Sequence, residues 1–184
     1  MTDIYLVRHG EAAASWAQSP DPGLSQLGHQ QAQDVALALA PKVDSIDVSL
    51  ITSPMLRARE TAQPLANQLQ QEVAVLEAFR EIQAPVPLAD RQQWLRAFMQ
   101  QQWEEQPEAL HAWRDLAFEA LFGLSHSAVI FTHFLVINAV VGQIKNDPAT
   151  LCCWPDNGAI THLRLDAGVL SVVALGKQMQ THVN

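Results

Sequence analysis

A chain of 184 residues, with 48% hydrophobic and 16% charged residues, has the composition expected of one globular domain spanning 1–184. Its formal net charge of −8 argues against a binding surface for nucleic acid or for an anionic membrane. No signal peptide is recognisable and no apolar run approaches the roughly 18 residues of a membrane span, so we expect a cytoplasmic protein without a membrane partner.

Two strand–helix units open the chain. Apolar runs at 4–7 and 47–51 predict buried strands. Residues 25–40 carry apolar side chains at helical spacing and predict the helix between them. A second helix is expected directly after Ser53 and Pro54. This alternation favours right-handed crossovers and a largely parallel sheet.

The ends of both helices carry local signals. Ser25 is the expected N-cap of the first helix, and Pro41 is its expected stop. Ser53 is expected to cap the second helix, with Pro54 at the first helical position, where proline is favoured. These signals predict both ends of the first helix and the start of the second.

The rest of the chain predicts an insertion and the remainder of the sheet. Residues 82–125 change in character and are interpreted as a helical cap inserted into the domain, with helical stretches near 88–103 and 107–123. The other predicted elements are a strand at 73–76, a strand at 128–132, a helix at 134–144, and an antiparallel hairpin of strands at 159–165 and 169–175 at the end of the sheet.

Basic side chains follow three of the predicted strands. Arg8 and His9 come after the first, Arg57 after the second, and His133 after the third. Ligands of an open α/β sheet collect at the carboxyl ends of its strands. Guanidinium groups match phosphoryl oxygens bidentately, and a neutral imidazole is a nucleophile whose pKa neighbouring arginines lower. These residues predict a pocket for a small phosphorylated ligand.

A phosphoryl-transfer site also needs an acid that protonates the leaving oxygen. Glu81 is the candidate, because it stands just before the predicted cap and could overhang the pocket. Glu77 is close in sequence but is expected to be a surface residue. No cofactor or metal is expected: the adjacent Cys152 and Cys153 lack the spacing of a zinc site and are interpreted as a reduced pair of small hydrophobic residues.

The motifs resemble those of the histidine phosphatase superfamily, also called phosphoglycerate mutase-like, and in particular its phosphatase branch. The resemblance rests on Arg-His-Gly-Glu at 8–11, on 53–62 and, approximately, on 24–32 and 79–81. It implies an α/β fold of three layers, α/β/α, with a mostly parallel mixed sheet. By this resemblance His9 is the nucleophile that forms phosphohistidine, Glu81 is the proton donor, and Arg8, Arg57 and His133 form the phosphate pocket.

The chain departs from the family pattern at three places. Ser15 stands where many relatives carry asparagine, residues 83–87 replace a glycine- and tryptophan-containing element, and Phe134 follows the second histidine in place of glycine. We favour packing of Phe134 into the following helix over a role in narrowing the pocket.

The function expected is a phosphatase, a phosphoric monoester hydrolase. It would hydrolyse a phosphomonoester or phosphohistidine, on a small-molecule phosphate ester or a phosphorylated peptide, through a phosphohistidine on His9. The alternatives are a phosphotransferase of the phosphoglycerate mutase type and a weakly active sensor of a phosphorylated ligand. Loops and inserted segments set the substrate in such folds, so the motifs do not name it.

Overall fold

The fold is centred on one mixed β-sheet, described by a computed structural model for residues 1–15, 18–43 and 47–179. Its strand order in this part of the chain is β3-β2-β4-β1-β5-β6. The first four strands of that order are mutually parallel, β5 is antiparallel to β1, and β6 is antiparallel to β5. The mostly parallel mixed sheet is confirmed. The strands are β1 (Thr2–Arg8), β2 (Val48–Thr52), β3 (Val73–Val75), β4 (Ser127–Thr132), β5 (Ile160–Asp166) and β6 (Val169–Ala174).

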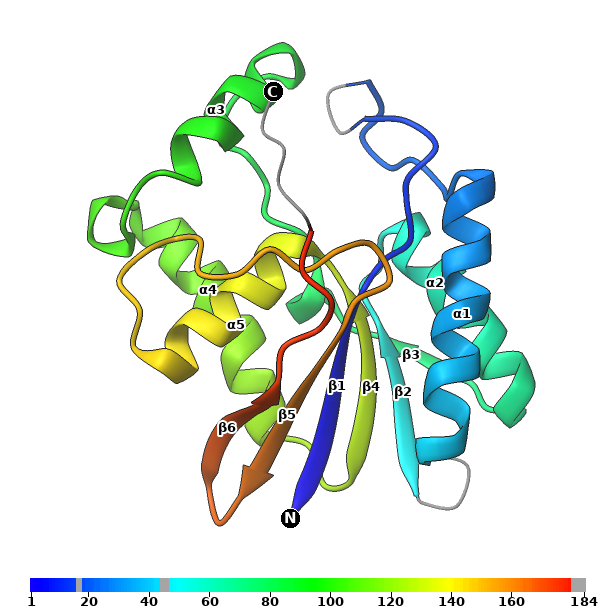
Figure 1. The fold of residues 1–184 in the computed structure, drawn as a ribbon. Helices are drawn as coiled ribbons and strands as arrows, with labels where there is room; N and C mark the ends of the chain where they lie inside the picture. Colours follow the sequence, from blue (N-terminus) through cyan, green and yellow to red (C-terminus); the bar gives the residue numbers. More distant parts are fainter. Residues whose placement is uncertain (16–17, 44–46, 180–184) are drawn as a thin grey trace.

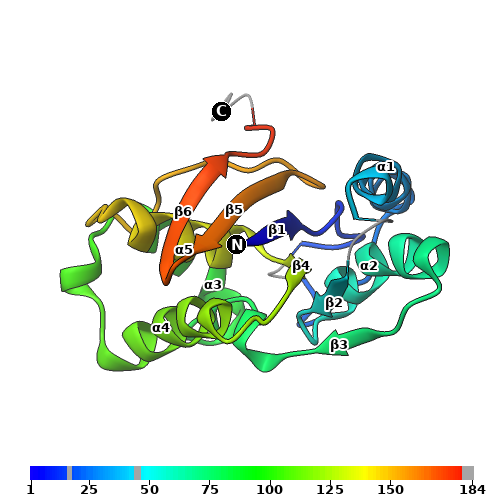
Figure 2. The same cartoon turned by 90° about the horizontal axis from the view of Figure 1, so that it is seen from below.

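Helices cover both faces of the sheet, which confirms the three-layer α/β/α architecture (Figures 1 and 2). The helices α1 (Gln26–Val43) and α2 (Leu56–Leu69) lie on one face, and α4 (Glu108–Phe122) and α5 (Phe134–Lys145) lie on the other. Successive side chains of a strand point to opposite faces of the sheet, so a central strand contributes to the hydrophobic core on each face. Tyr5 and Val7 of β1 belong to the core under α1 and α2, whereas Ile4 and Leu6 belong to the core with α5.

The hairpin β5–β6 forms the edge of the sheet, as predicted from the sequence. Its two turn residues, Ala167 and Gly168, have φ angles of 48° and 78°. Positive φ at both central positions matches the right-handed twist of the flanking strands. The turn chemistry therefore explains why these two strands are antiparallel while the crossover-connected strands are parallel.

The first helix begins where predicted but ends later than predicted. Ser25 accepts a hydrogen bond from the Gly28 N–H at its hydroxyl, 3.0 Å away, and caps the helix. The prediction that Pro41 stops α1 is wrong, because the helix continues to Val43. Proline removes the bond to the carbonyl four residues earlier, that of Leu37. Both residues are exposed, so water can solvate that carbonyl and the last turn survives.

The second helix begins two residues later than predicted. Its first helical residue is Leu56, and Met55 is its N-cap with an extended backbone. Pro54 therefore lies before the helix. The Leu56 N–H donates to Asp21 Oδ1 at 2.9 Å, so the loop between β1 and α1 supplies the capping group. Ser53, the expected cap, accepts from the Met55 N–H but also contacts a histidine of the site described below.

The segment 82–125 contributes helices to two different parts of the fold. A 3-10 turn at Leu88–Asp90 leads into α3 (Arg91–Phe98), which stands beyond the end of the sheet (Figure 1), whereas α4 packs beside α5 against the sheet. The helical stretch expected near 88–103 is interrupted after Phe98. The Thr150 hydroxyl donates to the Phe98 and Gln101 carbonyls, and these bonds end the helix. A second 3-10 turn follows at Trp103–Glu105. Within the described residues no helix is both long and apolar enough to cross a membrane.

Candidate active site

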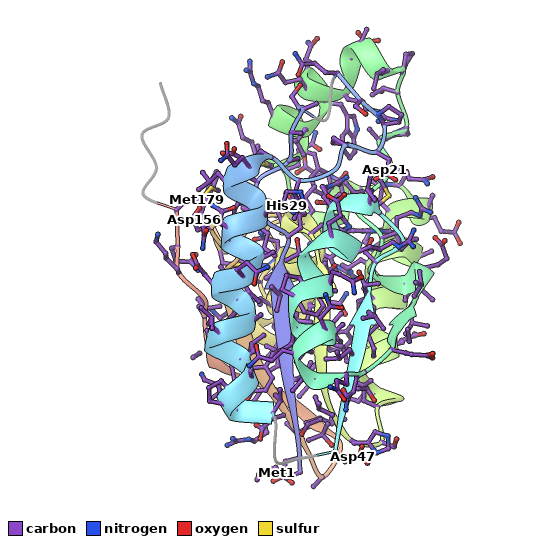
Figure 3. The ribbon with its side chains drawn as sticks, turned by 90° about the vertical axis from the view of Figure 1, so that its right-hand side faces the viewer. Met1, Asp21, His29, Asp47, Asp156 and Met179 are labelled. Atoms are coloured by element: carbon purple, nitrogen blue, oxygen red, sulfur yellow. The ribbon has the colours of Figure 1, made fainter. Side chains whose placement is uncertain are left out.

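Three neighbouring strands deliver the predicted residues to one end of the sheet. In the order β2-β4-β1, Ser53 follows β2, His133 follows β4, and Arg8 ends β1. Backbone hydrogen bonds continue the ladder past the strand ends: His9 N–H donates to the Thr132 carbonyl at 3.0 Å, and Ser53 N–H donates to the Phe131 carbonyl at 2.9 Å. In Figure 3 Asp21, Asp156 and Met179 mark this end of the sheet, and Met1 and Asp47 mark the opposite end.

A cavity of about 460 Å³ opens at this end. Its floor includes Arg8, His9, Arg57 and Glu81, four of the five residues predicted for the site. The fifth, His133, is fully buried directly beneath, with its ring centroid 5.2 Å from that of His9. The structure thus brings all five together from four separate segments of the chain.

His9 is held in one orientation by both ring nitrogens. Nδ1 lies 2.6 Å from the Gly10 carbonyl oxygen, which can only accept, so Nδ1 carries the proton. Nε2 is then unprotonated and accepts from the Arg57 Nε–H at 3.1 Å. Burial, followed by the charges of Arg57 and Arg8, holds the pKa of His9 well below its usual value. The ring is therefore neutral at pH 7, and its Nε2 lone pair is hydrogen-bonded to Arg57 at the edge of the cavity.

Arg57 lies in the first turn of α2 and is only 5% exposed. Its backbone carbonyl accepts from the Thr61 hydroxyl at 2.6 Å, and that hydroxyl accepts from the Gly10 N–H at 3.0 Å. Thr61 therefore ties the helix to the loop that carries His9. The Nη1 of Arg57 is buried without a hydrogen-bond partner and lies 3.9 Å from Asp21 Oδ1.

His133 pairs with Ser53. Its Nε2 lies 2.7 Å from the Ser53 hydroxyl, which already accepts from the Met55 N–H. If the hydroxyl donates its own proton to Nε2, the imidazole proton resides on Nδ1, the atom that is buried without a partner in the described structure. Burial and the neighbouring charges of His9 and Arg57 hold the pKa of His133 well below its usual value.

Arg8 is fixed by its surroundings at the opposite wall. Its Nη1 donates to the Pro155 carbonyl at 2.9 Å, and its guanidinium carbon lies 5.1 Å from the centre of the Phe134 ring. Phe134 lines the cavity and also packs against the apolar cluster beside α5. Phe134 therefore packs beside α5, as favoured from the sequence, and also lines the cavity.

Glu81 reaches the cavity from the loop after β3. Its carboxylate oxygens accept from the Ile82 N–H at 3.0 Å and from the Leu135 N–H, in the first turn of α5, at 3.4 Å. Burial raises the pKa of Glu81, which the two N–H groups and the arginines oppose. Glu77, by contrast, is exposed and pairs with Arg80 at 2.7 Å.

Several residues of the site were not singled out for these roles from the sequence. The Asn157 side chain donates to the His9 carbonyl at 3.1 Å, and Asp21 caps α2 beside Arg57. Ser53 and Thr61 lie within the 53–62 motif, which was the one available signal for them. Among residues 1–15, 18–43 and 47–179, no group of three or more His, Cys, Asp or Glu side chains is arranged to hold a metal ion.

Two histidines lie beside the buried Arg57 and the half-buried Arg8 at the strand ends of an α/β/α sandwich, and this charge suits a phosphoryl group. Residues 4–178 match the sequence model of the histidine phosphatase superfamily (branch 1). The chain belongs to this superfamily.

Solved structures share the fold across almost the whole chain. A phosphoserine phosphatase from Entamoeba histolytica, solved with 3-phosphoglyceric acid, has a TM-score of 0.72 at 20% identity and covers 97% of this chain and 98% of its own. A mycobacterial glucosyl-3-phosphoglycerate phosphatase has a TM-score of 0.75 at 18% identity, covering 97% and 100%. YhfR of Bacillus stearothermophilus has a TM-score of 0.75 at 22% identity, covering 94% and 96%.

One curated relative matches part of the chain. It is the PE-PGRS family protein PE_PGRS11 of Mycobacterium tuberculosis, 40% identical over 88 residues. The match covers 45% of this chain and 15% of that protein. The similarity therefore concerns a small part of a much longer protein.

Proposed function

We propose that this protein is a phosphatase that hydrolyses a phosphomonoester or phosphohistidine through a phosphohistidine on His9. The observation that carries the proposal is the state of His9. Its proton is held on Nδ1 by the Gly10 carbonyl, and its Nε2 lone pair accepts from Arg57 in the lining of a cavity that Arg8 also lines. The phosphatases among the structural neighbours support the same activity.

The first half-reaction transfers the phosphoryl group to the enzyme. The Nε2 lone pair of His9 attacks phosphorus in line with the leaving oxygen, the N–P bond forms and the P–O bond breaks. Glu81, whose pKa burial raises, gives its proton to the leaving oxygen, which departs as the alcohol. Arg57 exchanges its hydrogen bond to His9 for one to a phosphoryl oxygen, since a nucleophile must be free to react.

The second half-reaction returns the enzyme to its starting state. Water attacks phosphorus on phosphohistidine, the N–P bond breaks, and the Glu81 carboxylate takes the proton released by water. Inorganic phosphate leaves and His9 is again neutral. The same carboxyl thus donates in the first step and accepts in the second.

Charge on the transferred phosphoryl group is stabilised by groups already in place. Arg8 and Arg57 supply fixed positive charge, and the His133 Nδ1, buried and without a partner in the described residues, can donate to a phosphoryl oxygen. The Ser53 hydroxyl at 2.7 Å sets which nitrogen of His133 carries the proton. Ser53 is therefore a positioning residue that acts through His133.

The mutase and sensor alternatives receive less support. A mutase must bind the carboxylate of phosphoglycerate as well as phosphate, yet the only basic side chains lining the described cavity are those of Arg8, His9 and Arg57. A sensor would not need a carboxyl of raised pKa beside the nucleophile.

The test is direct detection of the intermediate. Rapid quenching of the enzyme with a ³²P-labelled monoester should give protein-bound label that is acid-labile and alkali-stable, and His9→Ala should abolish both label and turnover. Exposed His29→Ala is the matched control and should behave as the wild type. Hydrolysis of para-nitrophenyl phosphate by His9→Ala at the wild-type rate would overturn the proposal.

A further inference from the structure

The cavity has two parts of opposite character. Its floor carries the polar groups described above, whereas its outer wall is formed by apolar side chains from distant segments. Within the proposed chemistry, the floor takes the phosphoryl group and the outer wall surrounds the leaving group. The wall residues are Leu95 of α3, Met99 directly after that helix, Phe134, Trp154 and Met179.

The outer wall is held in place by packing. Leu95 and Met99 pack against the buried cluster that contains Phe98 and Trp103, so that face of α3 is anchored to the domain. On the opposite side, the rings of Phe134 and Trp154 lie 5.8 Å apart. Met179 donates its N–H to the Trp154 carbonyl at 2.7 Å. These contacts make a fixed apolar chamber above the floor.

Charges in the cavity exclude a second anionic group on the ligand. The guanidinium groups of Arg8 and Arg57 are the only permanent cations that line the cavity in the described part of the chain, and both are required by the phosphoryl group. The other ionisable lining groups besides His9 are the carboxyls of Glu11 and Glu81. A carboxylate on the leaving group would be partly desolvated by the wall and would find no further cation among the described lining residues, which is costly.

The size of the cavity calls for more than a phosphoryl group. Its volume of about 460 Å³ lies in the range of pockets that enclose small organic molecules, roughly 300–1,000 Å³. We propose that the substrate is a phosphate monoester of an uncharged, apolar alcohol, with a ring or alkyl chain that reaches Leu95 and Met99. This inference rests on the proposed phosphatase function.

The experiment compares esters whose leaving groups are all alcohols, so that binding, more than leaving-group acidity, sets the difference. 3-Phenylpropyl phosphate is compared with O-phosphoserine and 3-phosphoglycerate. Burial of the phenyl ring in the chamber should raise kcat/KM by roughly 10- to 100-fold over both charged esters. The preference should appear mainly in KM, because the ring lies away from the reacting atoms.

A charge placed in the wall should weaken the preference for the apolar ester. Met99→Lys has nearly the same length as methionine and puts an ammonium group beside the leaving group. It should lower kcat/KM for 3-phenylpropyl phosphate and raise it for 3-phosphoglycerate, changing their ratio by about tenfold or more. Gln100→Lys is the matched control, since Gln100 is exposed, adjacent in sequence and outside the cavity lining. The control should leave the ratio at its wild-type value.

The outcomes separate this inference from the function on which it rests. If the wild type forms phosphohistidine but prefers 3-phosphoglycerate or O-phosphoserine, the apolar substrate class is wrong and the phosphatase stands. Equal shifts of the ratio in Met99→Lys and Gln100→Lys would also overturn it, because a general change in net charge would then explain them. Failure of the wild type to hydrolyse any ester, para-nitrophenyl phosphate included, would overturn the function itself.

Discussion

Replacing Glu81 with glutamine removes the acidic proton from the site and one of the two acceptor oxygens of the side chain. The amide is close to the carboxyl in size, but it cannot release a proton near neutral pH. Burial raises the pKa of the native Glu81 carboxyl, which keeps it available as an acid closer to neutrality than an exposed glutamate. Glu81→Gln should therefore leave phosphate affinity nearly intact and slow the departure of leaving groups that need protonation.

The structure sets two magnitudes for this substitution. Loss of a general acid should reduce turnover of poor leaving groups by roughly 10²- to 10⁴-fold. An amide has only one acceptor oxygen, and the shorter existing bond, 3.0 Å from the Ile82 N–H, should keep it. The Leu135 N–H then faces the NH₂ group and loses its acceptor, at a cost of about 1–3 kcal/mol in the free energy of unfolding. The Tm should fall by about 2–4 °C for each kcal/mol.

The assay is kcat/KM over a series of phosphate monoesters, from para-nitrophenyl phosphate to alkyl phosphates, well below the Tm of the variant. The wild type should show a weak dependence on leaving-group acidity and Glu81→Gln a steep one, because para-nitrophenolate departs without much protonation. Glu77→Gln, which breaks only the exposed pair with Arg80, is the control and should match the wild type. An equal loss on every ester would refute the role of leaving-group acid. No loss at all would transfer the role to Glu77 or Glu11.

Three further predictions follow from contacts of the buried polar groups. Arg57→Ala should weaken phosphate binding and slow turnover for good and poor leaving groups alike, because it removes the positive charge that stabilises the phosphoryl group. Product inhibition by inorganic phosphate measures the binding, and an unchanged inhibition constant would contradict the prediction. The pKa values of His9 and His133 are lowered in the folded protein, so the unfolded chain binds more protons than the folded chain as the pH falls through about 6.5. The free energy of unfolding should therefore drop between pH 7.5 and 5.5 by about 1.4 kcal/mol for each histidine. Denaturant titration should show a smaller drop for His133→Gln than for the wild type. Asn138→Leu should leave the N–H groups of Cys152 and Cys153 without their acceptor, Asn138 Oδ1, to which they donate at 2.8 and 2.9 Å. The loss should cost about 1–3 kcal/mol for each group and lower the Tm by several degrees. Asn67 is exposed, and Asn67→Leu should change the Tm little.

Local pattern was sufficient for most of the elements and for naming the residues that the fold brings together at the candidate site. Alternating or continuous short runs of apolar residues predict strands, because a strand with one or both faces buried needs apolar side chains on those faces. The hairpin β5–β6 follows from its two turn residues. Arg8, His9, Arg57 and His133 could be named because each lies at the end of a strand or in the segment that follows it. Parallel strands bring their carboxyl ends to one edge, whatever the order of the strands in the sheet.

The errors at helix ends came from partners that are distant in sequence. Pro41 fails to end α1 because the carbonyl it leaves unbonded faces water, which no local motif reveals. α2 begins at Leu56 because Asp21 reaches its N–H from another loop. Ser53 looked like a local cap, yet its hydroxyl pairs with His133, 80 residues away.

The sequence by itself therefore determined which side chains form the candidate site, since charged and nucleophilic residues at strand ends are visible in the chain. Only the tertiary structure decided how they are held and what surrounds them. The strand order β2-β4-β1 sets His133 under His9, and side chains from α3, Trp154 and Met179 close an apolar wall over the floor. The physical reason is range: a strand or turn is set by neighbours in sequence, whereas a hydrogen bond or a pocket wall depends on residues that only packing brings together.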